Sequence, residues 1–167
     1  MNMHVSLRLA GLKDSDAITG IYNQGIVERI ATFEVNPRTR ADVEKWFDGI
    51  HPIVVAEIDS TVVAFASTST YRSRDCYKGI AEFSIYVEKN FRGQGIGTLL
   101  MEKLIEEAGK LGYWKLLSRI FVENVSSRAL MAKLGFREVG VYQNHGKLDG
   151  EWRDVVIVER LILENIK

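Results

Sequence analysis

The chain has a single cysteine and no long hydrophobic run, and its charges show no excess of either sign. Cys76 has no second thiol with which to form an internal disulfide, which favours a reducing compartment. No apolar run approaches the ~18 residues that a membrane-spanning helix needs. The first residues, MNMHVSLRLAG, also lack the pattern of a signal peptide. We therefore expect a cytoplasmic protein.

The balanced charge limits the kinds of partner. Lysine and arginine together number 22, as do aspartate and glutamate, so the formal net charge is zero. The overall charge gives no attraction to nucleic acid or to an anionic membrane. The sequence also has no stripe of basic and aromatic residues of the kind that binds nucleic acid. The three histidines and Cys76 have no metal-ligand spacing, and Cys76 has no neighbouring His-Asn arrangement for thiol catalysis. We expect no metal, no nucleic acid and no membrane partner, and any anion site must be local.

The length of 167 residues and the absence of a linker or repeat predict one domain over residues 1–167. Asp14 and Thr39 are plausible caps of two early helices. In the first of them, Ile18, Ile21, Tyr22 and Ile26 have the spacing of one apolar face. Long strands that alternate with helices indicate an α+β fold with a mixed, mostly antiparallel sheet. The predicted strands are 5–10, two arms of a hairpin in 52–71 that turns at residues 59–60, 79–89, 115–122 and two strands within 137–163. The predicted helices are 16–29, 39–49, a helix that ends near residue 111, and 124–136.

Three glycines stand directly before the third predicted helix, in NFRGQGIGTLLMEKL (90–104). At a helix N-terminus the first amides have no internal acceptor and the dipole is positive. Glycines allow an anion to approach those amides closely, which suits a pyrophosphate. The alternative is a glycine-rich turn without a ligand. The helix itself is predicted from the apolar spacing of Ile96, Leu100, Leu104, Ala108 and Leu111.

Three phosphate-binding motifs compete for this stretch. A P-loop requires Lys-Ser/Thr after the last glycine, and that pair is absent. A dinucleotide fingerprint requires G-x-G-x-x-G in a parallel βαβ unit, whereas the spacing here is G-x-G-x-G after predicted antiparallel strands. The third pattern, R/Q-x-x-G-x-G/A, is matched fully by residues 92–97.

This third pattern resembles the acetyl-CoA pyrophosphate loop of the GNAT superfamily of N-acetyltransferases. The order of predicted elements agrees over nearly the whole chain. ATFEVNPRT (31–39), YRSRDCYKGIAEFSIYV (71–87) and GEWRDV (150–155) resemble the phosphinothricin acetyltransferase-like branch. The resemblance implies the GNAT fold, acetyl-CoA as co-substrate and a homodimer. It also implies acetylation of a small amino-acid-like amine, such as phosphinothricin or methionine sulfoximine, in detoxification or resistance.

The same resemblance assigns the cofactor site. Asn124 is a favoured helix cap, and the matching family residue also contacts CoA. Arg92 would add a positive charge near the pyrophosphate, unless it is an ordinary solvated arginine. The backbone of Ile85, Tyr86 and Val87 would bind the pantetheine arm and the thioester oxygen. The amides that would bind the pyrophosphate belong to Gly93, Gln94, Gly95, Ile96, Gly97 and Thr98.

Glu82 is the candidate catalytic residue. It alternates with the apolar residues Phe83 and Ile85 in AEFSIYV, so we expect its carboxylate to be partly desolvated, as is common for a base. The alternative is an edge-facing or salt-bridged glutamate. In the family that the chain resembles, the matching glutamate acts as general base through water.

One residue departs from the family pattern. Many GNAT members have a tyrosine that protonates the leaving thiolate seven residues after the asparagine, and Met131 occupies that position. A methionine cannot donate a proton. The thiolate either leaves unprotonated or receives a proton from another group, such as Tyr142 or His145, and the sequence does not decide between these alternatives.

The acceptor site is expected around YRSRDCY. If this segment is extended, Arg72 and Arg74 project the same way and form a clamp for a carboxylate or phosphinate. A solvated loop is the alternative. The resemblance adds further substrate-side candidates, each with a plainer role in packing or in a solvated loop: Phe33, Tyr77, His145 and Trp152.

Other functions stay open at this stage. The acceptor could be a polyamine, an aminoglycoside or a protein N-terminus, although polycationic acceptors need an acidic pocket and the two arginines argue for an anionic substrate. A non-catalytic acyl-CoA sensor is disfavoured by the presence of Glu82. A nicotinamide-dependent oxidoreductase is the weakest alternative, because its glycine spacing does not match.

Overall fold

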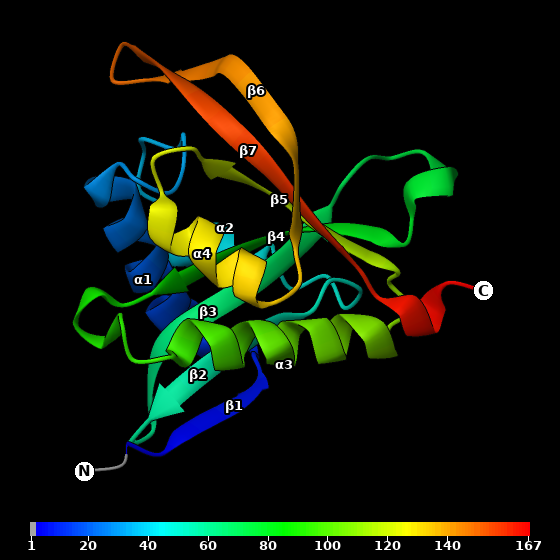
Figure 1. Cartoon of the computed structure of the whole chain (residues 1–167). Coiled ribbons are helices and arrows are strands. Elements are labelled where there is room, and N and C mark those ends of the chain that lie inside the picture. Colours follow the sequence, from blue (N-terminus) through cyan, green and yellow to red (C-terminus); the bar gives the residue numbers. More distant parts are fainter. Residues whose placement is uncertain (1–2) are drawn as a thin grey trace.

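The computed structural model describes residues 3–167 and contains one mixed sheet with helices on both of its faces (Figure 1). Its strands are β1 (Val5–Leu9), β2 (Ile53–Ile58), β3 (Thr61–Thr70), β4 (Ile80–Val87), β5 (Lys115–Phe121), β6 (Arg137–Leu148) and β7 (Glu151–Leu161). Its helices are α1 (Ser15–Glu28), α2 (Arg40–Glu44), α3 (Ile96–Lys110) and α4 (Val125–Lys133). Short 3-10 turns occur at Leu12–Asp14, Asp75–Tyr77, Lys89–Phe91 and Leu163–Asn165.

The strand order in the sheet is β1-β2-β3-β4-β5-β7-β6. The pair β4–β5 is parallel, and each of the other neighbouring pairs is antiparallel. The prediction of an α+β fold with a mixed, mostly antiparallel sheet and flanking helices is therefore confirmed.

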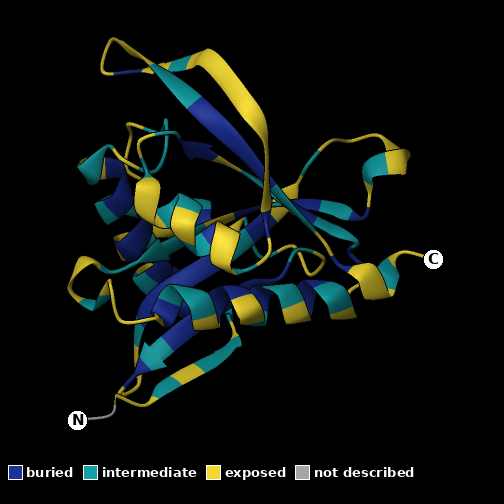
Figure 2. Cartoon of the chain, viewed as in Figure 1, coloured by how far each residue is buried: buried dark blue, intermediate teal, exposed yellow. Residues whose placement is uncertain are grey.

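A hydrophobic core lies on each face of the sheet. On one face, Leu100 and Leu104 of α3 pack with Phe83 of β4. On the other face, Ile18 and Ile26 of α1 pack with Phe65 of β3. Figure 2 shows the centre of the sheet buried, while the edge strand β6 is exposed over most of its length. The helical spacings predicted for α1 and α3 thus correspond to buried faces.

Turn residues at the two hairpins have the backbone that the sequence favours. Asp59 and Ser60, between β2 and β3, have φ of 49° and 63°. Asp149 and Gly150, between β6 and β7, have φ of 51° and 82°. Positive φ at both central residues matches the twist of a two-residue hairpin turn, and Asp and Gly adopt it most readily. The turn predicted at residues 59–60 is confirmed.

The predicted helices differ from the structure in three details. The helix capped by Thr39 ends at Glu44 rather than near residue 49, where Gly49 has a left-handed φ of 79°. Helix α3 ends at Lys110, close to the predicted end, but Leu111 is 55% exposed and does not continue the buried face. Asp14 is the N-cap residue of α1, yet its carboxylate accepts no hydrogen bond from that helix and pairs with Arg8 at 2.8 Å instead. A carboxylate forms a stronger hydrogen bond with a charged guanidinium than with a neutral backbone amide.

β4 and β5 diverge in the middle of the sheet. They pair only from Ile80–Lys115 to Glu82–Leu117, although both strands continue beyond these residues. The Ser118 hydroxyl donates a hydrogen bond to the Phe83 carbonyl at 2.8 Å, just past the last pair. The sheet therefore opens between the two strands and leaves backbone groups unpaired there.

Candidate active site

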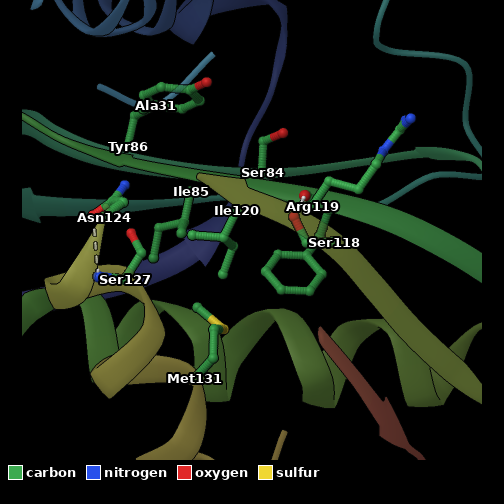
Figure 3. A pocket seen from close by; sticks show the side chains of 11 residues that line it. Ala31, Ser84, Ile85, Tyr86, Ser118, Arg119, Ile120, Asn124, Ser127 and Met131 are labelled. Atoms are coloured by element: carbon green, nitrogen blue, oxygen red, sulfur yellow. Dashed lines mark hydrogen bonds between the residues drawn. The ribbon is translucent and has the colours of Figure 1, made fainter. Parts of the chain in front are cut away.

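A small pocket lies in the opening between β4 and β5, and we call it the throat (Figure 3). Figure 3 shows Ser84, Tyr86 and Arg119 projecting to one side of the strands, whereas Met131 reaches up from α4 on the other side. The throat is lined by Ala31, Phe83, Ser84, Ile85, Tyr86, Ser118, Arg119, Ile120, Asn124, Ser127 and Met131.

Backbone amides of β4 face the throat. The Glu88 amide donates to Val63 of β3 at 2.8 Å, and the Phe83 carbonyl accepts from Ser118 of β5. Successive residues of a strand direct their peptide groups to opposite sides, and the β3–β4 register is continuous. The N–H groups of Ile85 and Val87 therefore point into the opening, where no strand pairs with them. Two such donors suit a ligand that lies along the strand edge.

A cleft of about 510 Å³ adjoins the throat beside the glycine loop. We call it the glycine-loop cleft. It is lined by Gly25, Glu28, Ile30, Ala31, Ile85, Tyr86, Val87, Phe91, Arg92, Gly93, Gly95, Ile96, Gly97, Thr98, Asn124, Ser126, Ser127 and Leu130. Every residue predicted for the cofactor lies here except Gln94, whose side chain is exposed and donates to the Asn90 carbonyl at 3.4 Å.

The glycines of this loop have separate physical roles. Gly93 and Gly95 have φ of 74° and 80°, a region that L-residues with a side chain rarely adopt. Gly97 lets α3 approach α4, since a Cβ there would lie 3.1 Å from Leu130 Cδ2. Gly95 caps α3 without a side-chain bond, so the amides of residues 96–98 have no helical acceptor. The loop is built to present amides to an anion.

The positive charge of Arg92, which was expected to face the pyrophosphate, is already paired with a carboxylate. Its guanidinium makes a two-pronged ion pair with Glu28 of α1, at 2.7 and 3.1 Å, and its Nε donates to the Val87 carbonyl at 2.9 Å. Glu28 therefore compensates the charge that was expected to face the pyrophosphate. In this arrangement Arg92 fixes the glycine loop to α1 and to the end of β4.

Asn124 connects α4 to the loop that follows α1. Its Oδ1 accepts from the Ser127 amide at 3.3 Å, which confirms the predicted helix cap. Its Nδ2 donates to the Ile30 carbonyl at 3.3 Å. Asn124 lines both the throat and the glycine-loop cleft, so it also determines how α4 faces the two pockets.

A second cleft, of about 530 Å³, adjoins the throat beside the β6–β7 hairpin. We call it the hairpin cleft. It brings together three of the residues predicted for catalysis or acceptor binding, Glu82, Phe33 and His145. Its full lining is Tyr22, Ala31, Thr32, Phe33, Glu34, Glu82, Phe83, Ser84, Tyr86, Ser118, Arg119, Phe121, His145, Gly146, Lys147 and Val155.

Glu82 is ion-paired in the hairpin cleft. Its Oε2 lies 2.9 Å from Nη2 of Arg119 on β5, and its side chain is 24% exposed. Along β4, Glu82 shares a face with Ser84 and Tyr86, while Phe83 turns into the core on the other face. Partial desolvation is therefore found, but in the salt-bridged form that was the alternative at the sequence level, and not among apolar side chains.

Phe33 is both a wall of the hairpin cleft and part of a small core. Its ring packs edge-on against Phe121 with centroids 4.8 Å apart. A Cβ at Gly146 would lie 2.8 Å from the Phe33 ring, so glycine is needed for this close approach. The aromatic contact fixes the loop before α2 against β5, and the close approach to Gly146 fixes it against the β6–β7 hairpin. Arg29 of the same loop strengthens this connection through an ion pair with Asp149 at 3.1 Å.

Four predicted substrate residues do not line the clefts. Arg72, Arg74 and Tyr77 belong to the loop between β3 and β4, which bends into a 3-10 turn instead of remaining extended. The guanidinium carbons of Arg72 and Arg74 lie over different rings, 5.2 Å from the centre of Tyr71 and 5.9 Å from that of Tyr77. The expected parallel clamp is therefore not formed.

Trp152 is the fourth residue outside the clefts. Its ring is 57% exposed and lies 4.8 Å below the ammonium of Lys147, which does line the hairpin cleft. Trp152 thus contacts a cleft residue without facing the cleft, and it is not part of the core.

Two tyrosines meet where the clefts join. The rings of Tyr22 and Tyr86 are 5.1 Å apart in an edge-on contact. Burial raises the pKa of both phenols above their ordinary value. Both rings therefore stay neutral near pH 7 and can donate hydrogen bonds to a ligand in the cleft.

Met131, at the usual position of the proton donor, and the two alternative donors, Tyr142 and His145, lie in different places. Met131 is buried in the throat, at 1% exposure. His145 lines the hairpin cleft and packs on Tyr142 with ring centroids 4.8 Å apart, whereas Tyr142 lines neither cleft. Ser127, which the sequence did not single out, lines the throat on the same helix as Met131.

Arg119 and Lys147 are the main cleft residues that sequence reasoning missed. Arg119 stands beside the apolar residues Ile120 and Phe121 in KLLSRIF, much as Glu82 stands beside Phe83 in AEFSIYV, and this parallel was the available signal. Lys147 has no comparable signal, because it stands in an exposed hairpin among other polar residues.

Residues 3–167 contain no group of three or more His, Cys, Asp or Glu side chains that could hold a metal ion. Among the helices of this same range, none has the length and apolar character to cross a membrane. The amide cradle of the glycine-loop cleft fits a different kind of group, a phosphate ester such as the pyrophosphate of acetyl-CoA.

The Acetyltransferase (GNAT) family model matches residues 23–136. An L-methionine sulfoximine/L-methionine sulfone acetyltransferase of Pseudomonas paraeruginosa is 32% identical over 162 residues, with 94% of each chain covered. A phosphinothricin N-acetyltransferase of Streptomyces coelicolor is 30% identical over 163 residues, covering 93% of this chain and 95% of the relative.

Solved structures agree with these relatives. The crystal structure of a GNAT superfamily phosphinothricin acetyltransferase from Sinorhizobium meliloti, in complex with AcCoA, has a TM-score of 0.89 and 32% identity. The match covers 95% of this chain and 89% of that one. The amide-presenting loop, the parted strands and these relatives lead to one conclusion: the chain belongs to the GNAT family of acetyltransferases.

Proposed function

We propose that the protein transfers an acetyl group from acetyl-CoA to the α-amine of a small amino-acid-like substrate. The observation that carries this proposal is the junction of two clefts at the throat. Ala31 and Tyr86 line the throat, the glycine-loop cleft and the hairpin cleft alike. A donor and an acceptor that enter from opposite sides would meet beside Glu82, which suits direct transfer in a ternary complex.

Acetyl-CoA is assigned to the glycine-loop cleft. The amides of the glycine loop and of the first turn of α3 would hold its pyrophosphate, and the unpaired edge of β4 would hold the pantetheine arm. The N–H groups of Ile85 and Val87 are the available donors for the thioester oxygen, whose negative charge grows as the amine attacks. Asn124 and Ser127 complete this side through the N-terminus of α4.

The acceptor amine is assigned to the hairpin cleft. An amine attacks a thioester only after losing its extra proton, and Glu82 is the carboxylate in position to take it, directly or through a water. The nitrogen then forms the new bond to the acetyl carbon, the bond from carbon to sulfur breaks, and CoA leaves as thiolate or thiol. Phe33 and His145 are proposed to contact the remainder of the substrate.

The proposed acceptors are glutamate-like analogues such as phosphinothricin and methionine sulfoximine, with a role in detoxification or resistance. The names of the relatives support this choice. The cleft lining contains two carboxylates, Glu34 and Glu82, and two cations, Arg119 and Lys147, so it has no acidic excess that would suit a polycationic acceptor. Arg72, Arg74 and Tyr77 have no place in this assignment.

We also propose a cytoplasmic homodimer. The support for a dimer is the edge strand β6, where Val139 and Val141 are 45% and 50% exposed. An open edge with apolar side chains is a surface that a second copy would cover. Light scattering after gel filtration should give twice the mass of 18.9 kDa, and a monomer at all concentrations tested would contradict this part.

The test of the activity is a thiol-release assay with acetyl-CoA and a panel of amines. Phosphinothricin, L-methionine sulfoximine and L-methionine sulfone should release CoA, and mass spectrometry should show one added acetyl group on the amine. Spermidine, an aminoglycoside and a peptide with a free N-terminus serve as alternative acceptors. Turnover of these amines without turnover of the amino acids would contradict the proposal.

A further inference from the structure

Arg119 stands at the boundary of the throat and the hairpin cleft, and it lines both. Its side chain extends on the side of the strands that carries Ser84 and Tyr86 (Figure 3). It is 48% exposed, and its single hydrogen bond among residues 3–167 is the one from Nη2 to Glu82. Strand β5 thus places a guanidinium directly beside the proposed base.

The ion pair itself explains little of this placement. Pairs between partly exposed charges contribute only slightly to stability, because water already solvates both groups. A guanidinium carries five N–H donors in a planar fork, and the bond to Glu82 uses one of them. Nη2 carries a second N–H, so one two-donor edge of the fork, Nε with Nη2 or Nη1 with Nη2, is left for another acceptor. The geometry of such an edge matches both oxygens of a carboxylate.

The short distance between Arg119 and Glu82 indicates which acidic group of the substrate the guanidinium can bind. The attacking nitrogen has to lie within reach of Glu82, directly or through one water. In an α-amino acid the carboxylate oxygens lie roughly 3 Å from the amine nitrogen, whereas the terminal group of a glutamate-like side chain lies roughly 5–6 Å away. With Nη2 only 2.9 Å from the base, the α-carboxylate is the group that meets the guanidinium.

We infer that Arg119 binds the α-carboxylate of the acceptor and thereby restricts the enzyme to free α-amino acids. This inference rests on the proposed function. It excludes as good substrates those amines that lack an adjacent carboxylate, including polyamines and the N-termini of peptides. Lys147, the other cation of the hairpin cleft, lies over Trp152, and the ion pair of Glu82 is made by Arg119 and not by Lys147. It therefore serves as the matched control.

The experiment compares L-methionine sulfone with its carboxamide, which keeps the amine and the sulfone and removes only the negative charge. The ratio of kcat/KM for acid and amide is measured for the wild type, Arg119→Gln, Arg119→Lys and Lys147→Gln. Comparing ratios between enzymes removes the intrinsic difference in basicity between the two amines. Thermal melts confirm that each variant is folded, and acetyl-CoA affinity is measured by calorimetry.

We expect the acid-to-amide ratio to fall about 10- to 100-fold in Arg119→Gln, mainly through KM for the acid, because a charge-assisted hydrogen-bond pair is lost. Arg119→Lys should recover part of the ratio, and Lys147→Gln should keep the wild-type ratio. Acetyl-CoA affinity should not change.

Either of two other results would overturn the inference while leaving the proposed function intact. One is an unchanged ratio in Arg119→Gln with equal losses for both substrates, which would mean that Arg119 acts only through Glu82. The other is an equal fall in Lys147→Gln, which would mean that the general field of the cleft attracts the acid. If the wild type acetylates neither compound but acetylates other amines, the proposed function fails and the inference fails with it.

Discussion

Two glycines of α1 provide a matched test of how the clefts are built. Gly25 faces the Tyr86 ring, and a Cβ at residue 25 would lie 2.7 Å from Cδ1 and Cε1. Gly20 is in the same helix, but it is exposed and a Cβ there would meet nothing within 4 Å. Gly25→Ala and Gly20→Ala therefore make the same chemical change in one helix and differ only in what the methyl group meets.

The expected free energies follow from these contacts. Replacing an exposed helical glycine by alanine stabilises a helix by about 1 kcal/mol, so Gly20→Ala should be more stable than the wild type. In Gly25→Ala the same gain is opposed by about 1–3 kcal/mol for forcing the Tyr86 ring against its neighbours. Tyr86 cannot retreat easily, because it contacts Tyr22 on one side and stacks on Phe65, with centroids 5.4 Å apart, on the other.

Urea denaturation should therefore separate the two variants by about 1–3 kcal/mol in free energy of unfolding, which corresponds to roughly 2–12 °C in Tm for a chain of this size. Because Tyr86 lines both clefts, Gly25→Ala should also lower kcat/KM, whereas Gly20→Ala should not. If Gly25→Ala were stabilised as much as Gly20→Ala, the packing of α1 against Tyr86 would be wrong.

Other predictions test the loop and the fold. Gly95→Ala should lower the free energy of unfolding by about 1–2 kcal/mol, because alanine is strained in a left-handed conformation. Calorimetry should also show that this variant binds acetyl-CoA more weakly. Binding equal to that of the wild type would argue against the amide cradle. Arg8→Met should cost about 3 kcal/mol at pH 7, since it leaves the Asp14 carboxylate, 5% exposed, without its cation. The hydrogen bond from Arg8 lowers the pKa of Asp14 below 3.8, so the pair stabilises the fold above that pH and the stability is lost as the pH falls further. Urea midpoints should thus differ between wild type and Arg8→Met at pH 7 and converge in acid; a constant difference would show that Asp14 is not the group involved.

Local patterns allowed much of the fold and of the glycine-loop cleft to be predicted. The apolar spacing of α1 and α3, the turn at residues 59–60 and the cap at Asn124 depend on residues close together in the chain. The glycine loop is similarly local, since its amides and positive φ angles belong to residues 93–98. Such features follow from backbone sterics and helix geometry alone.

The charge pairs of the site could not be predicted in this way. Arg92 meets Glu28 and Arg119 meets Glu82 across separations of 64 and 37 residues. Which charges pair at such separations in sequence depends on how strands and helices pack. Neither the composition nor a local sequence pattern determines that packing. The loop with Arg72 and Arg74 shows the converse error, because proximity in sequence to β4 suggested a clamp that the folded loop does not form.

The central claim is that Glu82 removes the proton of an amine that attacks acetyl-CoA in the throat. The most direct measurement is the turnover of Glu82→Gln with L-methionine sulfone, together with its affinity for acetyl-CoA. The account predicts a fall in kcat of about 10²- to 10⁴-fold, the usual contribution of a general base, with unchanged affinity for acetyl-CoA. Turnover equal to that of the wild type would contradict it.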